Sequence, residues 1–488
     1  MPMNNENALF IVYDDREFTN DENKPFVGSR RYSDIIFQRK KLKDYFVGNL
    51  GSISSEYFFH IRESLDVENL RHRIEEADGQ TALFIIASRA GIVANEQFEQ
   101  LIARLPYAEC SFSDRTFKPL VVFLKNSHEL IEHWDHFAEE PIHTWEQPPA
   151  QMERLTSVQP LDLGRSRDFL SFMSGSTEAR HFNEVEIDSY FYTKKSTDKK
   201  KMEAEYRFYE LVPEAMRPWL IQPFDFKDEG NTASYKMMRY YLADAALQWV
   251  HGAFDNNSFR EFIDRLLYFV AQRPQKTAAK SEVTQHATSL YLDKVESRVE
   301  QLLALPEGKK INDLVRVADP ELEIQTQVAR YKKLYNKYQK DFALDYLAAG
   351  HGDPCFSNLL YDQHRYILKA IDPKGAVTED AVWTHPYYDL CKISHSVMGN
   401  YDFVNNGLYE VALTANNSIQ LKINSHDCSN MQSIFMERLK LQGYDWRVIR
   451  LAEASLFLSM LPLHIDHPNK VMAFVLTAKH ILDDVENG

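Results

Sequence analysis

The chain has 488 residues, a formal net charge of −15, and a composition that is 44% apolar and 12% aromatic. This length exceeds one ordinary hydrophobic core and predicts about three units of domain size. The acidic balance argues against nucleic acid or an anionic membrane surface as the main partner, so a soluble enzyme is expected.

The cysteines and the amino terminus indicate a reducing compartment. Four cysteines are scattered without metal-type pairing, which is typical of neither a disulfide framework nor a zinc site. The first residues lack the basic and apolar regions of a signal peptide, and no apolar run approaches the about 20 residues that span a bilayer. The sequence therefore predicts a cytoplasmic protein without a membrane span, and it leaves the oligomeric state open.

Residues 1–155 have the pattern of an α/β domain. Continuous apolar runs at 8–13, 82–87 and 119–124 predict buried strands. Between the last two, residues 95–105 carry Phe98, Leu101, Ile102 and Leu105 at helical spacing. Strands that alternate with helices predict a mostly parallel sheet.

Parts of this region resemble sugar-nucleotidyltransferase-like domains. The resemblance rests on the strand at 8–13, the Arg-Tyr-Ser-Asp-Ile segment at 31–35 and the strand at 83–88. The Gly-rich loop and the downstream Pro-Lys of those enzymes are missing, which predicts a degenerate domain with lost or altered transferase chemistry. A plain α/β domain that scaffolds or presents a substrate is the alternative.

Residues 139–165 are rich in Pro and polar groups and predict a linker, with a domain boundary near 155. A Ser-Gly-Ser-Thr turn at 174–177 is a candidate for covering phosphates, although a simple turn explains it equally. A β-rich run at 185–196 then ends in Lys194 and Lys195. A lysine on such a strand can hold nucleotide phosphates and pair with a helical glutamate.

The following helix, residues 201–212, supplies that glutamate. Met202, Tyr206 and Tyr209 lie at i, i+4 and i+7 and define its buried face. At about 100° per residue, Glu205 falls at the margin of this face and Glu203 falls outside it. Glu205 is therefore the predicted partner of the lysine.

The chain then passes from strands to helices. Residues 220–226 and 233–241 predict a hairpin, because a turn containing Asp228 and Gly230 separates them. A capping box is predicted at Ser258 to Glu261, ahead of an apolar stripe that ends at Val270. Charged amphipathic segments continue to residue 346.

The most informative stretch is the polar loop Gly-His-Gly-Asp-Pro-Cys-Phe-Ser-Asn at 350–358, followed by Ile-Asp-Pro-Lys-Gly at 371–375. Phosphoryl transfer from ATP needs a carboxylate that positions the acceptor hydroxyl and takes its proton, and Asp353 fits that role. Mg²⁺ prefers hard oxygen ligands, so Asn358 and Asp372 fit as its ligands. An ordinary polar turn explains either residue alone, but not the joint spacing.

These two motifs resemble those of the aminoglycoside phosphotransferase and choline kinase family, which shares the protein-kinase-like fold. The glycine at 352, where protein kinases carry arginine, and Asp-Pro-Lys-Gly in place of Asp-Phe-Gly both favour the small-molecule branch. The resemblance covers roughly residues 166–488. It implies an α/β N-terminal domain followed by a two-lobed α+β kinase-like domain, with an N-lobe at 166–244 and a large helical C-lobe at 245–488.

The resemblance also implies roles outside the catalytic loop. Lys194, with Lys195 nearly as good, and Glu205 are expected to hold the nucleotide phosphates. Met238 and Tyr240 are expected in the hinge that bonds adenine through its backbone, although a simple core strand explains their side chains as well. The Asp-Leu-Cys run at 389–391 resembles the family's Asp-Leu-Ala helix start, and it predicts that Asp389 caps the helix and braces the catalytic loop.

The sequence thus predicts an ATP- and Mg²⁺-dependent kinase that phosphorylates a hydroxyl of a sugar, amino sugar or amino alcohol. A catalytically silent kinase-like scaffold is one alternative, and a bifunctional protein whose N-terminal domain binds a nucleotide sugar is another. Acceptor identity depends on pocket shape and is not encoded in these motifs.

Overall fold

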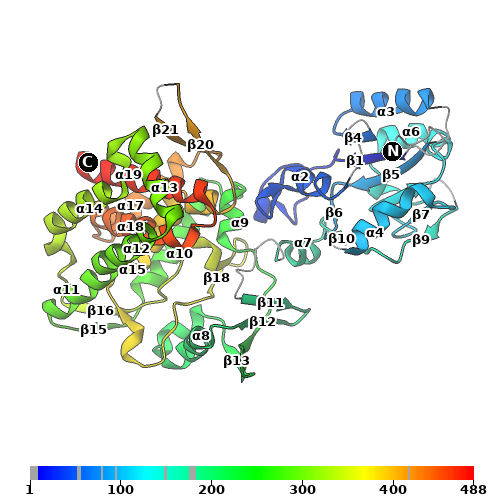
Figure 1. Ribbon diagram of the computed structural model, residues 1–488. Coiled ribbons are helices and arrows are strands. Elements are labelled where there is room, and N and C mark those ends of the chain that lie inside the picture. The colour runs from blue at the N-terminus through cyan, green and yellow to red at the C-terminus, as the bar shows by residue number, and fades with distance from the viewer. Residues whose placement is uncertain are drawn as a thin grey trace. The chain divides into compact units, whose positions relative to one another are not determined.

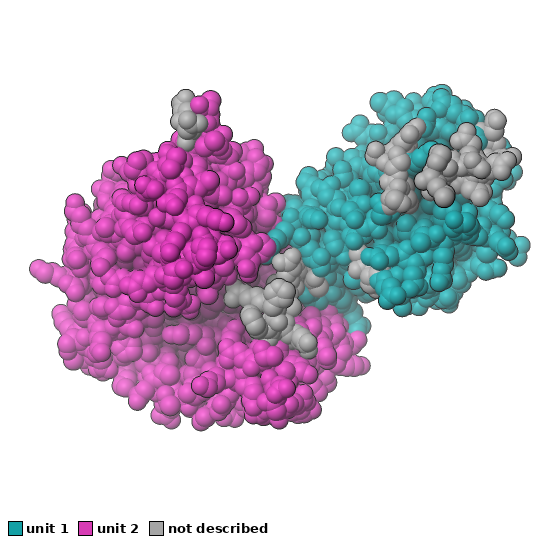
Figure 2. Space-filling model, viewed as in Figure 1, with its two compact units in different colours: residues 1–178 teal, residues 179–488 magenta. Residues whose placement is uncertain are grey.

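The computed structural model describes residues 9–51, 57–77, 81–93, 96–147, 151–174, 183–415 and 418–488. The chain folds into two compact units, residues 1–178 and 179–488, which are coloured separately in Figure 2. Gly175 to Thr177, most of the candidate phosphate-covering turn, lie outside the described residues.

Unit 1 is built on a six-stranded mixed sheet in the order β4-β1-β5-β8-β7-β9 (Figure 1). The strands are β4 (Phe58–Ile61), β1 (Leu9–Asp14), β5 (Ala82–Ala87), β8 (Val121–Leu124), β7 (Phe112–Ser113) and β9 (Glu153–Arg154). β1 is parallel to both β4 and β5, whereas β8 is antiparallel to β5. The continuous apolar runs are buried, as expected of strands covered on both faces.

Helices cover this sheet from both sides. α3 (Ser64–Glu76) buries Val67, Leu70 and Ile74, and α4 (Glu96–Arg104) buries Phe98, Leu101 and Ile102. Figure 1 shows α3 and α4 on opposite sides of the strands. The predicted strands and the predicted helix near residue 100 are thus confirmed.

α7 (Ser166–Met173) packs within unit 1 through aromatic pairs. Phe172 stacks on Phe37 with ring centroids 4.3 Å apart, and Phe169 stacks on Phe26 at 5.9 Å. The kinase-like N-lobe was expected to begin at residue 166, but residues 166–173 form a helix that packs within unit 1. Unit 1 ends at residue 178, which is later than the predicted boundary near 155.

Unit 2 begins with a four-stranded antiparallel sheet in the order β11-β12-β14-β13. Its strands are β11 (Asn183–Ile187), β12 (Phe191–Ser196), β14 (Ala233–Met238) and β13 (Pro223–Asp228), so the predicted hairpin is confirmed. α8 (Lys199–Leu211) follows β12 and is capped by Asp198, whose side chain accepts a hydrogen bond from the Lys201 backbone. This helix buries Met202, Glu205 and Phe208.

The remainder of unit 2 is mainly helical. α10 (Asn256–Ala271) buries the predicted apolar stripe, but its cap differs from the prediction. Asp255 accepts from the backbone of Asn257 and Ser258, and the Ser258 hydroxyl bonds back to the Asp255 amide. Ser258 is thus the third helical residue of a capping box that begins one turn earlier, because the aspartate is the residue with extended backbone.

Two long helices form the centre of the helical part. α18 (Trp446–Met460) is buried from Val448 to Ser459, and α19 (Pro468–Asn487) packs beside it. α12 (Lys294–Ala304) packs against α18 in the same cluster of apolar side chains. Within the described residues, no helix has both the length and the apolar character needed to cross a bilayer.

One buried carboxyl group makes the stability of this part depend on pH. Asp402, in α16 (Tyr401–Asn405), is 1% exposed. Burial raises the pKa of Asp402 to about 7, above the value of about 4 expected in an unfolded chain. The contribution of Asp402 to stability is therefore complete below the unfolded pKa and is lost as the pH rises through about 7.

We predict that Asp402→Asn removes this pH dependence, because the amide has no proton to lose. Between about pH 5 and about pH 8 the unfolding free energy of the variant should fall less than that of the native chain, as measured by urea unfolding. Asp466→Asn, at an exposed carboxylate, is the control and should follow the native profile. Parallel profiles for the native chain and Asp402→Asn would contradict the prediction.

Candidate active site

The loop at 350–358 is fixed by a buried carboxylate from a helix that follows it. β16 (Tyr346–Ala349) leads into the loop, and α15 (Tyr387–Val397) carries Asp389, whose side chain is fully buried. Asp389 accepts hydrogen bonds from the backbone amides of His351, at 3.0 Å, and Gly352, at 2.8 Å. Arg273 balances its charge through an ion pair of 2.8 Å.

Gly352 allows the two sequence motifs to meet. Its φ of +83° is unfavourable for other residues, and a Cβ there would lie 2.6 Å from the Lys374 Cβ. The Lys374 backbone amide also donates to the His351 carbonyl at 3.0 Å. The Asp-Pro-Lys-Gly segment therefore lies directly against the turn that presents Asp353.

Asp353 forms an ion pair with a lysine that the sequence analysis did not single out. The Lys392 ammonium lies 2.9 Å from an Asp353 carboxylate oxygen, and its side chain is only 12% exposed. Burial opposes ionisation of Asp353, but the charge of Lys392 outweighs it and lowers the pKa of Asp353 below its ordinary value. Asp353 is thus a carboxylate at neutral pH, which is the form able to accept a proton.

A short hairpin brings Asn358 and Asp372 together. β17 (Leu359–Asp362) pairs with β18 (Ile367–Ala370) so that Leu359 lies opposite Ala370. One residue beyond this pair, the Ile371 amide donates to the Asn358 carbonyl at 2.9 Å. The side-chain amide of Asn358 donates to the Asp353 carbonyl at 2.9 Å, so its nitrogen is used within the loop and its side-chain oxygen is left to accept or to bind a cation.

Asp372 is also held from the sheet. The Lys194 ammonium, on β12, lies 3.0 Å from an Asp372 oxygen and 2.7 Å from a Glu205 oxygen. Tyr235 on β14 donates to the same Glu205 oxygen at 2.8 Å. Burial alone would lower the pKa of Lys194, but Asp372 and Glu205 raise it above its ordinary value. The lysine is therefore a fixed, fully charged cation.

The neighbouring candidates point elsewhere. Lys195 faces Glu229 at 3.5 Å, because successive residues of a strand alternate between faces. Glu203 is exposed and pairs with Arg207 at 3.4 Å on the outer face of α8. Of the two lysines and two glutamates considered from the sequence, the structure brings Lys194 and Glu205 together.

The backbone of α8 packs against the end of the second motif, at Gly375 and Ala376. Gly375 has a φ of +86°, and a Cβ there would lie 2.7 Å from the Ala204 backbone carbon. The Ala376 amide donates to the Ala204 carbonyl at 3.0 Å. This contact places Glu205 beside Asp372, which is why a glycine is required three residues after that aspartate.

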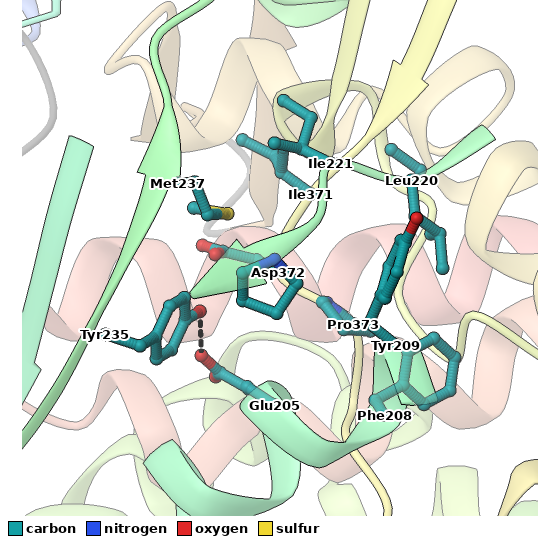
Figure 3. Close-up of a pocket in the computed structure, with 12 residues that line it drawn as sticks. Glu205, Phe208, Tyr209, Leu220, Ile221, Tyr235, Met237, Ile371, Asp372 and Pro373 are labelled. Carbon is teal, nitrogen blue, oxygen red and sulfur yellow. Dashed lines mark hydrogen bonds between the residues drawn. The ribbon is translucent and has the colours of Figure 1, made fainter. Parts of the chain in front are cut away.

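Glu205 and Asp372 line one small pocket (Figure 3). It has about 300 Å³ of empty space, part of it open to solvent. Glu205 and Asp372 are its acidic residues, and its remaining walls are mostly apolar: Phe208, Tyr209, Leu220, Ile221, Pro223, Tyr235, Met237, Ala370, Ile371 and Pro373. These walls limit the access of water to the Lys194 pair, whose lysine side chain is 5% exposed.

Met238 and Tyr240 lie where β14 ends and the chain leads toward α9 (Ala245–Val250). Their side chains are 52% and 43% exposed. The intervening Arg239 amide donates to the Tyr190 carbonyl at 2.8 Å. The segment is thus a connection with two exposed side chains, and its backbone is bonded to the chain at Tyr190.

The sequence contained a signal for Lys392 that the analysis did not use. Lys392 follows Asp389 by three residues, which places both side chains on one face of α15. Tyr235 shares one face of β14 with the buried Ala233 and Met237, so the sequence pattern did not distinguish it from an apolar core residue. Within the described residues, no group of three or more His, Cys, Asp or Glu side chains is arranged to hold a metal by itself.

Comparison with known proteins gives a likeness only at the level of solved structures. No family model matches the chain, and no curated protein matches it. The chain is similar to aminoglycoside phosphotransferase APH(4)-Ia, with 9% identity and a TM-score of 0.40 over 63% of this chain and 92% of that one. It is also similar to spectinomycin phosphotransferase APH(9)-Ia in complex with ADP and spectinomycin, with 12% identity and a TM-score of 0.35 over 64% and 90%. These low values establish no family, so function must be argued from the site.

We predict that Asp389→Ala destabilises unit 2 strongly. Removing one partner leaves Arg273 charged and buried and frees two loop amides, so the unfolding free energy should fall by about 3–5 kcal/mol. Denaturant unfolding measures this change. Asp466→Ala is the matched control at an exposed position and should change stability by less than about 0.5 kcal/mol. A loss for Asp389→Ala no larger than that of the control would show that the brace is dispensable.

Proposed function

We propose that the chain is an ATP- and Mg²⁺-dependent phosphotransferase that acts on a hydroxyl of a small molecule. The observation that carries this proposal is a set of contacts: Lys194 pairs with Asp372, the preceding Ile371 amide donates to the Asn358 carbonyl, and the Asn358 side chain donates to the Asp353 carbonyl. These residues come from the sheet, the second motif and the loop, and they supply a phosphate-binding cation, two oxygen ligands and a carboxylate in one place. That set is what phosphoryl transfer requires of a protein.

The donor set fits a magnesium ion bound with a nucleotide. Asn358 uses its side-chain nitrogen within the loop, so its oxygen is available, and Asp372 has one oxygen bonded to Lys194 and a second to offer. Two side-chain oxygens with phosphates and waters are typical of magnesium in kinases. When bound, the ion would neutralise charge on the β- and γ-phosphates. Lys194, fixed by Glu205, would hold the remaining phosphate charge.

Asp353 would act on the acceptor. Its carboxylate would accept a hydrogen bond from the acceptor hydroxyl, align that oxygen with the γ-phosphorus and take the proton as the new oxygen–phosphorus bond forms. The bond from the γ-phosphorus to the bridging oxygen breaks at the same time, and ADP leaves with that oxygen. Lys392 keeps Asp353 ionised beforehand and supplies positive charge beside the transferred group.

We predict that Asp353→Asn abolishes transfer without abolishing nucleotide binding. An amide cannot take the proton, so acceptor-stimulated ADP release should fall by about 10²- to 10⁴-fold. Asp380→Asn, an exposed aspartate in the segment after the second motif, is the control and should retain activity. Retained turnover in Asp353→Asn would overturn the assignment. If the native chain binds nucleotide but releases no ADP with any sugar or amino alcohol tested, the scaffold alternative is favoured.

We predict that Lys194→Met weakens binding of Mg²⁺-ATP about tenfold or more, since a charge-assisted contact to phosphate is lost. Titration calorimetry measures this affinity. Lys195→Met is a control on the same strand, because Lys195 lies on the other face and contacts Glu229. Equal losses in the two variants would contradict the assignment, and the unfolding midpoint of each variant shows whether it is folded.

A further inference from the structure

Three lysines lie on the elements that flank the Asp353 loop, and the proposed transfer accounts for only one of them. We call Lys294, Lys374 and Lys392 the lysine cluster. Lys392 contacts Asp353 directly, at 2.9 Å. The other two lie on different elements: Lys374 belongs to the second motif and packs against Gly352, and Lys294 is the first residue of α12 and donates to Tyr388 of α15.

Lys294 is tied to Lys392 through one tyrosine. The Lys294 ammonium donates to the Tyr388 hydroxyl at 3.1 Å and lies 5.7 Å from the centre of its ring. Tyr388 precedes Lys392 by four residues on α15, so the two side chains share a face of that helix. Lys294 is half-buried and has no carboxylate partner among the residues that the structure describes. Two of its three N–H groups are therefore left for another acceptor.

Lys374 belongs to the second motif, Asp-Pro-Lys-Gly at 372–375. Its aliphatic stem lies against Gly352, the residue before Asp353, where an added Cβ would be 2.6 Å from the Lys374 Cβ. Its side chain is exposed and is likewise unpaired with a carboxylate in the described part of the chain. Of the three lysines, Lys392 alone pairs with a carboxylate, that of Asp353, in the described part of the chain.

The electrostatics agree with this placement. Burial, and after it the positive charges of Lys392 and Lys374, lower the pKa of Lys294 to about 8. A lysine loses proton affinity in this way when like charges are close and no anion compensates them. At neutral pH Lys294 is still mainly charged, so the excess positive charge persists.

The nucleotide does not account for this charge. Its phosphates are served from the sheet by Lys194, which reaches Asp372 on one side of the loop. Lys294 lies on α12 and donates to Tyr388 of α15, the helix whose Lys392 pairs with the carboxylate that must contact the acceptor. Lys392 can serve the transferred phosphate, but Lys294 and Lys374 remain without an anion.

Resting on the phosphotransfer proposed above, we propose that the acceptor carries an anionic group, a carboxylate or a phosphate, which Lys294 and Lys374 bind while its hydroxyl contacts Asp353. The same charges disfavour acceptors with an ammonium group, because like charges in a partly buried site repel. Amino sugars and amino alcohols are therefore poorer substrates than acidic sugars or polyols of the same size.

The test compares neutral, cationic and anionic acceptors built on the same carbon skeleton. One set is glucose, glucosamine, gluconate and glucose 6-phosphate; a smaller set is glycerol, serinol, glycerate and glycerol 3-phosphate. ADP release is measured with each, and binding is measured by calorimetry with saturating Mg²⁺ and a non-hydrolysable ATP analogue, which fills the γ-phosphate position. We expect the anionic members of at least one set to bind and react best, and the carboxylate and phosphate members show which anion is preferred.

Lys294→Gln should then raise the KM and the Kd for the anionic compound about tenfold or more, with little change in the KM for ATP. Lys309→Gln removes one charge from an exposed position on α13 (Pro306–Ala318) and should change neither. The proposal is overturned if a neutral or cationic member binds or reacts best, if no anionic member binds, or if Lys294→Gln binds the anion as well as the native chain. A different result would contradict the phosphotransfer proposal and not the anion proposal. In that case the anionic compounds bind and Lys294→Gln weakens their binding, but none of them stimulates ADP release.

Discussion

The buried ion pair between Asp389 and Arg273 is the constraint on which the site depends. A carboxylate without access to water is costly unless it is paired and hydrogen-bonded, and here it has an arginine on one side and two backbone amides on the other. Those amides belong to the loop that presents Asp353. The charge of Asp389 would destabilise the fold if it were unpaired. Paired with Arg273 and bonded to the loop amides, it fixes the position of Asp353, the carboxylate that the proposed chemistry uses.

A second set of contacts joins the sheet to this loop. Lys194 bonds to Glu205 on α8 and to Asp372 beyond the hairpin, while Gly375 lets the second motif lie against the backbone of α8. A shift of α8 would change both the glycine contact and the lysine pair. Lys194 and Asp372 are consequently positioned together, and the hydrogen bond from the Asn358 side chain to the Asp353 carbonyl links them to the catalytic-loop candidate.

Sequence reasoning succeeded where a local period determines the outcome. Helical phase separates Glu205 from Glu203, so that choice required only the positions of neighbouring residues. Lys194 was preferred to Lys195 from the resemblance alone, and strand alternation, which separates the two lysines in the structure, was not used. It was wrong at the cap of α10, where Asp255 competes with Ser258 for the same role and backbone geometry decides. Asn358 and Asp372 were proposed from spacing, but the hairpin that joins them is a tertiary feature.

The lysine cluster shows the limit of such reasoning. Lys392 shares a helical face with Asp389, so a pattern existed; Lys294 is almost 60 residues from Asp353 in sequence, and only folding brings it near. The chain as a whole is strongly acidic, with a net charge of −15, so long-range attraction does not guide an anion to this site. At physiological salt, however, charges beyond about 8 Å are screened, so an anion would respond mainly to direct contact with the half-buried Lys294 and the exposed Lys374. Selection for the proposed anionic acceptor would therefore arise at contact, where Lys294 bonds to Tyr388 alone and no carboxylate of the described residues competes for its other two donors.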